Sequence, residues 1–238
     1  MNRTARLNAQ AMHRLSAHGD CDGAVKDLAA ALAGITSHVT NGAVPRSQAS
    51  VPSETQNPPR PSSAVCRVKT SLPYLGVEPR SSSVAYFERP FLIDTDDGVV
   101  EEDSDRGPKM SDEEAAYCSS VCFYNMGLAL YTQYKKETLK CDRLTKANDC
   151  FLRAFDLLAA CKLQPDDSKL ILLLATCNNL AALQGDLGNI VLLHYWAQKF
   201  DIVLDFIDAR SHWEDKDYHS FRLKKLLNSF AISAAPTA

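Results

Sequence analysis

The chain has 238 residues, a formal net charge of −3 and a hydrophobic content of 45%. That apolar fraction suffices for a sizeable core. The balanced charge argues against a dedicated nucleic-acid or membrane-surface binder, because such proteins concentrate lysine and arginine. No apolar run approaches the roughly 20 residues that a membrane-spanning helix requires. The composition therefore predicts a soluble globular protein with neither nucleic acid nor membrane among its partners.

Prolines divide the chain into unlike regions. Nine of the eleven prolines lie between residues 36 and 108, where they prevent a continuous helix because proline removes a backbone donor and fixes φ. We therefore expect a first helix pair at residues 1–35, a Pro/Ser-rich and partly disordered insertion at 36–108, two helix pairs at 109–211, and a capping segment and tail at 212–238.

The first region has the pattern of two helices joined by a turn. Residues 7–15 fit a first helix. Gly19 suits the position after its C-terminus, and Asp20 suits the N-cap of the next helix. From Ala24 to Ile35, apolar residues recur at spacings of three and four, which predicts a helix that buries one face.

Two apolar pieces interrupt the polar insertion. Residues 64–68 and 84–93 contain β-branched and aromatic residues between Pro and Ser clusters, which predicts strands. Pro90 should place the second strand at an edge or end it early. We expect a small antiparallel hairpin within residues 64–93 that covers part of the helical core.

Two polar stretches flank these pieces. Residues 41–63 are predicted to be disordered, because they hold almost no large apolar residue. The acidic residues between 94 and 105 are interpreted as a solvated loop, with a docking site for a basic partner or a cation as the alternative.

Helical signals fill the second half of the chain. Ser111 and Glu114 have the spacing of a capping box, and helices are expected at about 111–140, 142–163, 167–184 and 189–209. A last segment at about 215–232 should cap the array, or its end should join the hairpin as a strand. Short loops force successive helices antiparallel. The predicted fold class is therefore mainly α, an array of antiparallel helix pairs.

Small and large residues alternate at the expected helix crossings. The series is Ala24, Leu28 and Ala31 in the first pair, then Phe123, Met126, Gly127 and Leu130 followed by Ala147, Phe151, Ala154 and Pro165 in the second. This pattern resembles the tetratricopeptide repeat family. The resemblance implies an α-solenoid, although the step from Gly127 to Ala147 is twenty residues where the family uses twelve. Leu193 and Phe200 replace small residues in the last pair.

In the tetratricopeptide family the first helices of the pairs line a concave groove that holds an extended peptide. The resemblance implies that the groove is lined by Tyr124, Leu128, Tyr131 and Thr132 in one pair and by Asn178, Ala182 and Asp186 in the next. The lysines of the version that binds chaperone carboxylates are missing. Asn125, Asn178 and Asn179 also lie on first helices, where the resemblance implies that asparagines hold a peptide through its backbone or its terminal carboxylate. For Asn178 and Asn179 the alternative is hydrogen bonding between helices.

These features predict a non-catalytic protein–protein interaction module, a scaffold or adaptor that binds a peptide or helix of unknown identity. No metal, cofactor or catalytic site is predicted, because nucleotide-binding, metalloprotease and hydrolase motifs are missing from the sequence. An open groove would support a free scaffold. A groove filled by the insertion would instead indicate a closed or purely structural protein.

Two other functions compete with this hypothesis. Cys118 and Cys122 share a helical face and could form a metal or redox site with His194, His212 or His219, although such cysteines more often pack in a core. The alternative is an oligomeric structural subunit, because a short array leaves apolar ends that need caps.

Cysteine usage and the N-terminus bear on location. The eight cysteines contain no C-x-x-C pair and no secretory signal is found, which favours an intracellular, cytoplasmic protein. The first eighteen residues carry three arginines, two histidines and no acid. This resembles an organellar presequence, but the same residues are needed for the first helix pair.

Overall fold

Helices dominate the computed structural model, which describes residues 3–42, 66–70, 86–95, 110–137, 141–163, 168–209, 218–223 and 225. The helices are α1 (Arg3–His13), α2 (Cys21–Gly42), α3 (Asp112–Lys136), α4 (Cys141–Ala159), α5 (Ser168–Asp186) and α6 (Ile190–Asp208), with β1 at Cys66–Thr70 and β2 at Phe91–Thr95. The prediction of a mainly α fold is confirmed. Residues 1–35 were predicted to hold the first helix pair and 41–63 to be disordered, but α2 continues to Gly42. Residues 43–63 and 96–105 lie outside the described residues, and so does most of the predicted capping segment.

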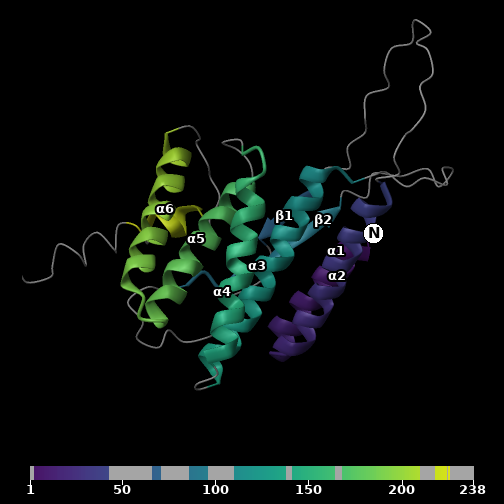
Figure 1. The fold of residues 1–238 in the computed structure, drawn as a ribbon, viewed down its shortest axis with the longest axis horizontal. Coiled ribbons are helices and arrows are strands. Elements are labelled where there is room, and N and C mark those ends of the chain that lie inside the picture. The colour runs from purple at the N-terminus through teal and green to yellow at the C-terminus, as the bar shows by residue number, and fades with distance from the viewer. Residues whose placement is uncertain are drawn as a thin grey trace, which may run out of the picture.

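Each helix packs against the next one in the chain, from α1 to α6. Figure 1 shows α1 and α2 at one end of the long axis, α3 and α4 in the middle, and α5 and α6 at the other end. Residues 170–184 of α5 are buried without a break, because this helix has neighbours on several sides. None of the described helices combines the length and the hydropathy needed to cross a membrane.

The turn between α1 and α2 follows the predicted signals. A five-residue π-helix, Arg14–His18, extends α1 and ends at Gly19, whose φ of 61° lies in the left-handed region that glycine adopts without steric cost. The Asp20 carboxylate accepts a hydrogen bond of 2.9 Å from the backbone N–H of Gly23. This bond lowers the pKa of Asp20 and caps the start of α2.

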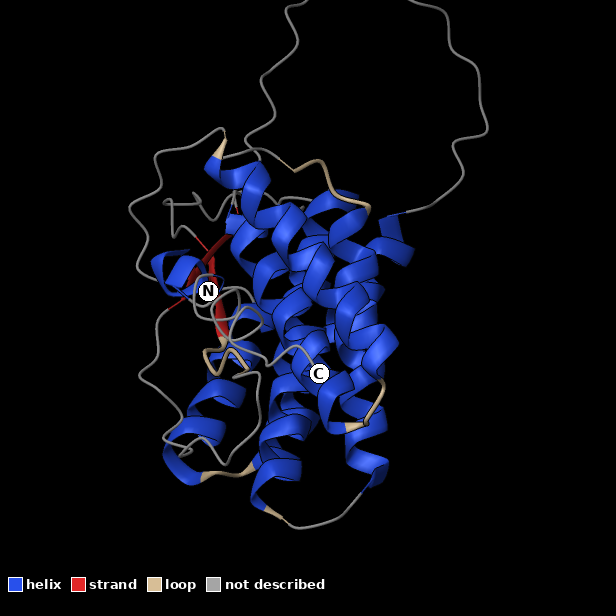
Figure 2. Ribbon diagram, turned by 90° about the vertical axis from the view of Figure 1, so that its left-hand side faces the viewer, coloured by secondary structure: helices blue, strands red, loops and turns tan. Residues whose placement is uncertain are grey.

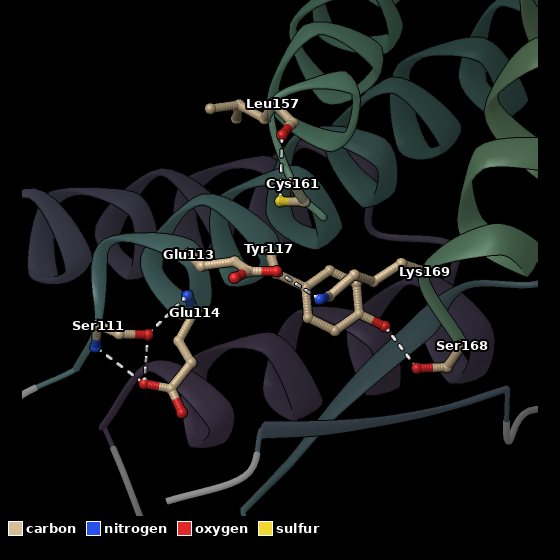
Figure 3. A network of polar contacts seen from close by, with 8 residues as sticks. All are labelled: Ser111, Glu113, Glu114, Tyr117, Leu157, Cys161, Ser168 and Lys169. Carbon is tan, nitrogen blue, oxygen red and sulfur yellow. Dashed lines mark hydrogen bonds and ion pairs between the residues drawn. The ribbon is translucent and has the colours of Figure 1, made fainter. Parts of the chain in front are cut away.

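Polar contacts fix the start of α3 (Figure 3). Ser111 and Glu114 form the predicted capping box, in which the Glu114 N–H donates to Ser111 Oγ and the Glu114 carboxylate accepts from the Ser111 N–H at 2.8 Å. Tyr117 lies 2.8 Å from Ser168 between their hydroxyl oxygens. Lys169 pairs with Glu113 at 2.9 Å, so the first turns of α3 and α5 lie together.

The closest approach of α3 to α4 occurs at Gly127. A β-carbon at this position would lie 2.9 Å from Cδ1 and Cε1 of Phe151, a distance that real contacts essentially never show. Phe151 is fully buried and packs against the Tyr124 ring, with 5.6 Å between the ring centroids. The glycine therefore sets how closely the two helices pack.

The strands β1 and β2 form a two-stranded antiparallel sheet, in which Cys66 pairs with Thr95 and Thr70 with Phe91. Figure 2 shows both strands to one side of the long helices. The expected antiparallel pair is thus present, but its second strand begins after Pro90 instead of spanning residues 84–93. Proline cannot donate a ladder hydrogen bond, and residues 86–90 belong to neither a helix nor a strand.

The helical residues 218–223 and 225 pack against the last helix pair. Tyr218 donates a hydrogen bond to Asp208, and Lys225 pairs with Asp205 at 2.6 Å. The ring of Phe221 is buried and contacts Phe200, with centroids 5.8 Å apart.

Candidate functional site

The seven residues predicted to line a groove do not form an open surface. Asp186 is half-buried and the other six are buried, namely Tyr124, Leu128, Tyr131, Thr132, Asn178 and Ala182. Residues 86–91 of the insertion lie against two of these side chains, with the Tyr86 ring 4.8 Å from Tyr131 and the Phe91 ring 5.1 Å from Tyr124 between centroids. The predicted groove is therefore occupied by the chain itself.

The side-chain amide of Asn125 on α3 forms hydrogen bonds with both the backbone N–H and the carbonyl of Phe91. Its Oδ1 accepts from the Phe91 N–H at 3.0 Å, and its Nδ2 donates to the Phe91 carbonyl at 2.7 Å. Asn8 on α1 donates to the same carbonyl at 3.1 Å and accepts from Asn125 at 2.9 Å. Both asparagines are fully buried, so these bonds satisfy groups that have no access to water.

Asn179 on α5 binds the main chain of Phe87, four residues before Phe91, in the same way. Its Oδ1 accepts from the Phe87 N–H at 2.6 Å, and its Nδ2 donates to the Phe87 carbonyl at 3.0 Å. The Tyr124 hydroxyl also donates to that carbonyl at 3.2 Å and accepts from Asn179 at 3.1 Å. Asn178 donates to Asn179 at 3.2 Å and thereby orients its amide.

Side chains of the inserted residues occupy aromatic surroundings. Tyr86 packs on Tyr131, Phe91 meets Tyr124 edge to face, and Phe87 packs on Phe221 with 4.8 Å between centroids. Such pairs contribute about 0.5–1.5 kcal/mol beyond the burial of their area. The site thus holds an extended segment by its main chain through amides and by its side chains through aromatic rings.

Several polar groups at one end of the site are buried without a hydrogen-bond partner among the described residues. They are the hydroxyls of Tyr86 and Thr132 and one side-chain oxygen each of Glu88 and Gln133. Burial raises the pKa of both Tyr86 and Glu88. Holding residues 86–88 in place therefore carries an unfavourable polar contribution.

The remaining predicted residue, Asp186, belongs to a polar contact at the edge of the site. Tyr131 donates a hydrogen bond of 2.6 Å to its carboxylate, and Lys135 pairs with the same oxygen at 2.6 Å. Burial and the neighbouring carboxylate raise the pKa of Tyr131. The phenol is accordingly a stable donor, which positions the ring against Tyr86.

The sequence interpretation placed Asn125 and Asn179 on first helices, where the tetratricopeptide resemblance implies that asparagines hold a peptide through its backbone, but it did not include them among the residues that line the groove. Asn8 was not considered, and hydrogen bonding between helices was the alternative for Asn179. The signal was the presence of asparagines on the apolar helices, namely Asn8 on α1, Asn125 on α3 and the pair Asn178 and Asn179 on α5. A buried amide requires a partner, and here the partner is the main chain of the insertion.

Of the histidines considered for a metal or redox site, His194 lies on α6 and His219 in the helical residues 218–223, and His212 lies outside the described residues. Cys118 and Cys122 are buried in α3, and the described part of the chain contains no group of three or more His, Cys, Asp or Glu side chains that could hold a metal ion. Burial raises the pKa of Cys177 to about 12 and of Cys150 to about 11. These two thiols stay protonated near neutral pH, and the thiolate is the reactive form of cysteine.

No protein-family model matches this chain, and neither a curated protein sequence nor a solved structure matches it. The interpretation of the site consequently depends on its own contacts.

Proposed function

We propose that this chain is a non-catalytic protein-interaction module of tetratricopeptide-like helix pairs whose concave surface recognises an extended peptide. The observation that carries the proposal is the paired amide bonding of Asn125 and Asn179, each of which binds both the N–H and the carbonyl of one peptide residue. In this conformation the bound peptide is residues 86–91 of the same chain. The module is then closed, and a partner binds by replacing this segment.

The contacts suggest which chemistry a partner peptide needs. Bonds from amides to main-chain groups are independent of peptide sequence, so they select an extended backbone. The ring contacts of Tyr86, Phe87 and Phe91 select aromatic side chains at the first, second and sixth positions. Pro90 is buried at the fifth position, where no N–H is required and an extended preceding residue is favoured.

Tethering gives the internal segment an advantage over any partner. A segment attached to its own binding site is present at an effective concentration on the order of 1 mM. A free peptide that makes the same contacts with a Kd of about 10 µM would then bind about 100-fold more weakly than to an empty groove. Partner binding should therefore be strongly affected by substitutions in the internal segment.

The test uses a fluorescently labelled peptide with the sequence of residues 84–95 and the full chain. Phe87→Ala/Phe91→Ala in the chain should weaken the internal segment and increase peptide affinity at least about tenfold. Adding Asn125→Ala/Asn179→Ala to that variant should abolish binding. A peptide with alanine at positions 87 and 91 is the matched control, and circular dichroism establishes that each variant is folded.

Two results would contradict the proposal. One is a folded Phe87→Ala/Phe91→Ala variant that does not bind the labelled peptide, which would mean that the segment is a permanent part of the core. The other is peptide binding that survives the loss of both asparagines, which would place the peptide on another surface.

A further inference from the structure

One side chain of the internal segment (residues 86–91) lies in surroundings that disfavour its charge. Glu88, the third residue of the segment, is half-buried, and its Oε2 atom is buried without a hydrogen-bond partner in the described part of the chain. Burial raises the pKa of this carboxyl group, and no positive charge of the described residues counteracts that rise. A buried carboxylate that is neither paired nor hydrogen-bonded opposes binding. The third position of the segment is therefore unfavourable for an acid.

The main-chain and ring contacts of the segment favour its place in the groove and do not involve the side chain at the third position. The main chains of Phe87 and Phe91 pair with Asn179 and Asn125. The rings of the same two phenylalanines pack on other aromatic rings, and Pro90 is buried. A peptide in the same conformation therefore keeps these contacts whatever its third residue is.

A second acid lies at the same end of the groove. Burial raises the pKa of Tyr86, and the charges of Glu88 and Asp186 raise it further, so both carboxylates act on one phenol. Lys135 pairs with Asp186 at 2.6 Å between Nζ and a carboxylate oxygen. This lysine compensates the charge of Asp186, whereas the charge of Glu88 has no such partner in the described chain.

We infer that the partner of this groove is an extended peptide with an uncharged residue at its third position, and that Glu88 keeps the internal segment displaceable. The inference rests on the proposed function, because it concerns the ligand of the same groove. Glutamine and methionine have about the length of glutamate and carry no charge. Either side chain therefore fits the space of Glu88 without the cost of a buried carboxylate.

The charge of Glu88 offsets part of the advantage that tethering gives to the internal segment. A tethered segment has an effective concentration on the order of 1 mM and outcompetes a free peptide that makes equal contacts. A neutral third residue lets the free peptide make better contacts than the segment does. A lower concentration of such a peptide is then sufficient for exchange.

Competition between peptides tests the inference on the full chain. The chain carries Phe87→Ala/Phe91→Ala so that its groove is available, and unlabelled peptides of residues 84–95 displace the labelled one at neutral pH. Peptides with Glu88→Gln or Glu88→Met should bind at least about fivefold more tightly than the original sequence, because the buried, unsatisfied charge is lost. Asp94→Asn is the matched control, since it removes one negative charge elsewhere in the peptide and should leave the affinity unchanged.

Hydrogen exchange tests the same effect inside the chain. The N–H groups of Phe87 and Phe91 donate to Asn179 and Asn125, so their exchange reports the opening of the internal segment. Both groups should exchange at least about fivefold more slowly in the Glu88→Met chain than in the wild type, because the neutral side chain removes the same cost. Unchanged exchange would overturn the role of Glu88 in displacement.

The outcomes separate this inference from the proposed function. Equal affinity of the original and the Glu88→Gln peptides would overturn the inference and leave the peptide groove in place. Tighter binding of a Glu88→Lys peptide than of the Glu88→Met peptide would also overturn it, since the groove would then select a cation. If no peptide bound the folded chain although exchange slowed in Glu88→Met, the proposed function would be excluded and the inferred partner with it.

Discussion

At the scale of single residues, buried amides and one glycine determine how the helices meet the insertion. Asn125 uses both atoms of its amide and is placed between Asn8 and Phe91. The side-chain amide of asparagine presents a donor and an acceptor next to each other, and no other side chain of the same size does so. Gly127, two residues further along α3, allows the approach of Phe151.

Asn125→Asp should destabilise the protein by about 3–5 kcal/mol at neutral pH, because a buried carboxylate would face the carbonyl of Phe91 and the amide oxygen of Asn8. The penalty should shrink as the pH falls, since the protonated acid regains a donor. Urea denaturation at pH 7 and pH 4 measures both effects. Asn148→Asp is the control. The side-chain oxygen of Asn148 accepts a hydrogen bond from Gln184, and a carboxylate oxygen can accept the same bond. Equal losses for the two variants would contradict the assigned role.

Gly127→Ala should lower the free energy of unfolding by about 1–3 kcal/mol, because the added methyl group overlaps the ring of Phe151. Gly34→Ala is the matched control inside α2, where the nearest atom to a new β-carbon is Thr4 Oγ1 at 3.8 Å. That variant should gain up to about 1 kcal/mol from helix propensity. Combining Gly127→Ala with Phe151→Leu should recover part of the loss in thermal unfolding, and no recovery would mean that the ring is not the cause.

At the scale of elements, residues 86–95 differ from the helices in which groups hold them in place. They are held by amides and rings that belong to other elements, whereas each helix satisfies most of its own backbone groups. The element also contains polar atoms that are buried without a partner in the described chain, among them an oxygen of Glu88. Such an element has a lower intrinsic stability than the helices that it contacts.

Glu88→Gln should stabilise the protein at neutral pH and have little effect in acid. Burial raises the pKa of Glu88 in the folded chain, so the folded state binds its proton more tightly than the unfolded state does. Stability is then lost as the pH rises from about 4.3, the ordinary value for glutamate, through the raised value. Urea midpoints of both chains between pH 3.5 and 7.5 should diverge with rising pH. Parallel curves would show that burial does not change the pKa of Glu88.

At the scale of the whole molecule, the inserted segment adds to the contacts between helices that are not neighbours in the chain, such as those of α3 with α5. Helices α1 to α6 pack in sequence order, and the stability of such an array is approximately a sum of local contributions. Residues 86–91 hydrogen-bond to side chains of α1, α3 and α5 and contact Phe221. The segment should therefore make unfolding more cooperative than the array alone would be.

Phe91→Ala should cost about 3–5 kcal/mol, because the side chain is 1% exposed. It should also lower the denaturant m-value, because the helix pairs would no longer unfold as one unit. Phe155→Ala is the comparison, since that ring on α4 packs on Trp196 of α6 and its loss should leave the m-value unchanged. If both variants lost protection from hydrogen exchange equally in all the described helices, this view would be contradicted.

Local sequence signals predicted the helices well, because their determinants lie within a few residues of one another. The capping box at Ser111, the turn at Gly19 and Asp20, and the small residue Gly127 at a helix crossing are all found in the structure. The strand pair was predicted with its second strand placed too early. In the structure Pro90 is the last residue before the second strand, and it does not end the strand as the sequence suggested.

Neighbouring residues were sufficient to specify the helices, their caps and the concentration of prolines in one insertion, since propensity and periodicity are local properties. The position of that insertion depends on long-range contacts. The contacts that hold it join residues 83 and 92 positions apart, and no local pattern specifies such a pairing. For this reason the side chains predicted to line a partner groove are covered by residues 86–91 of the same chain.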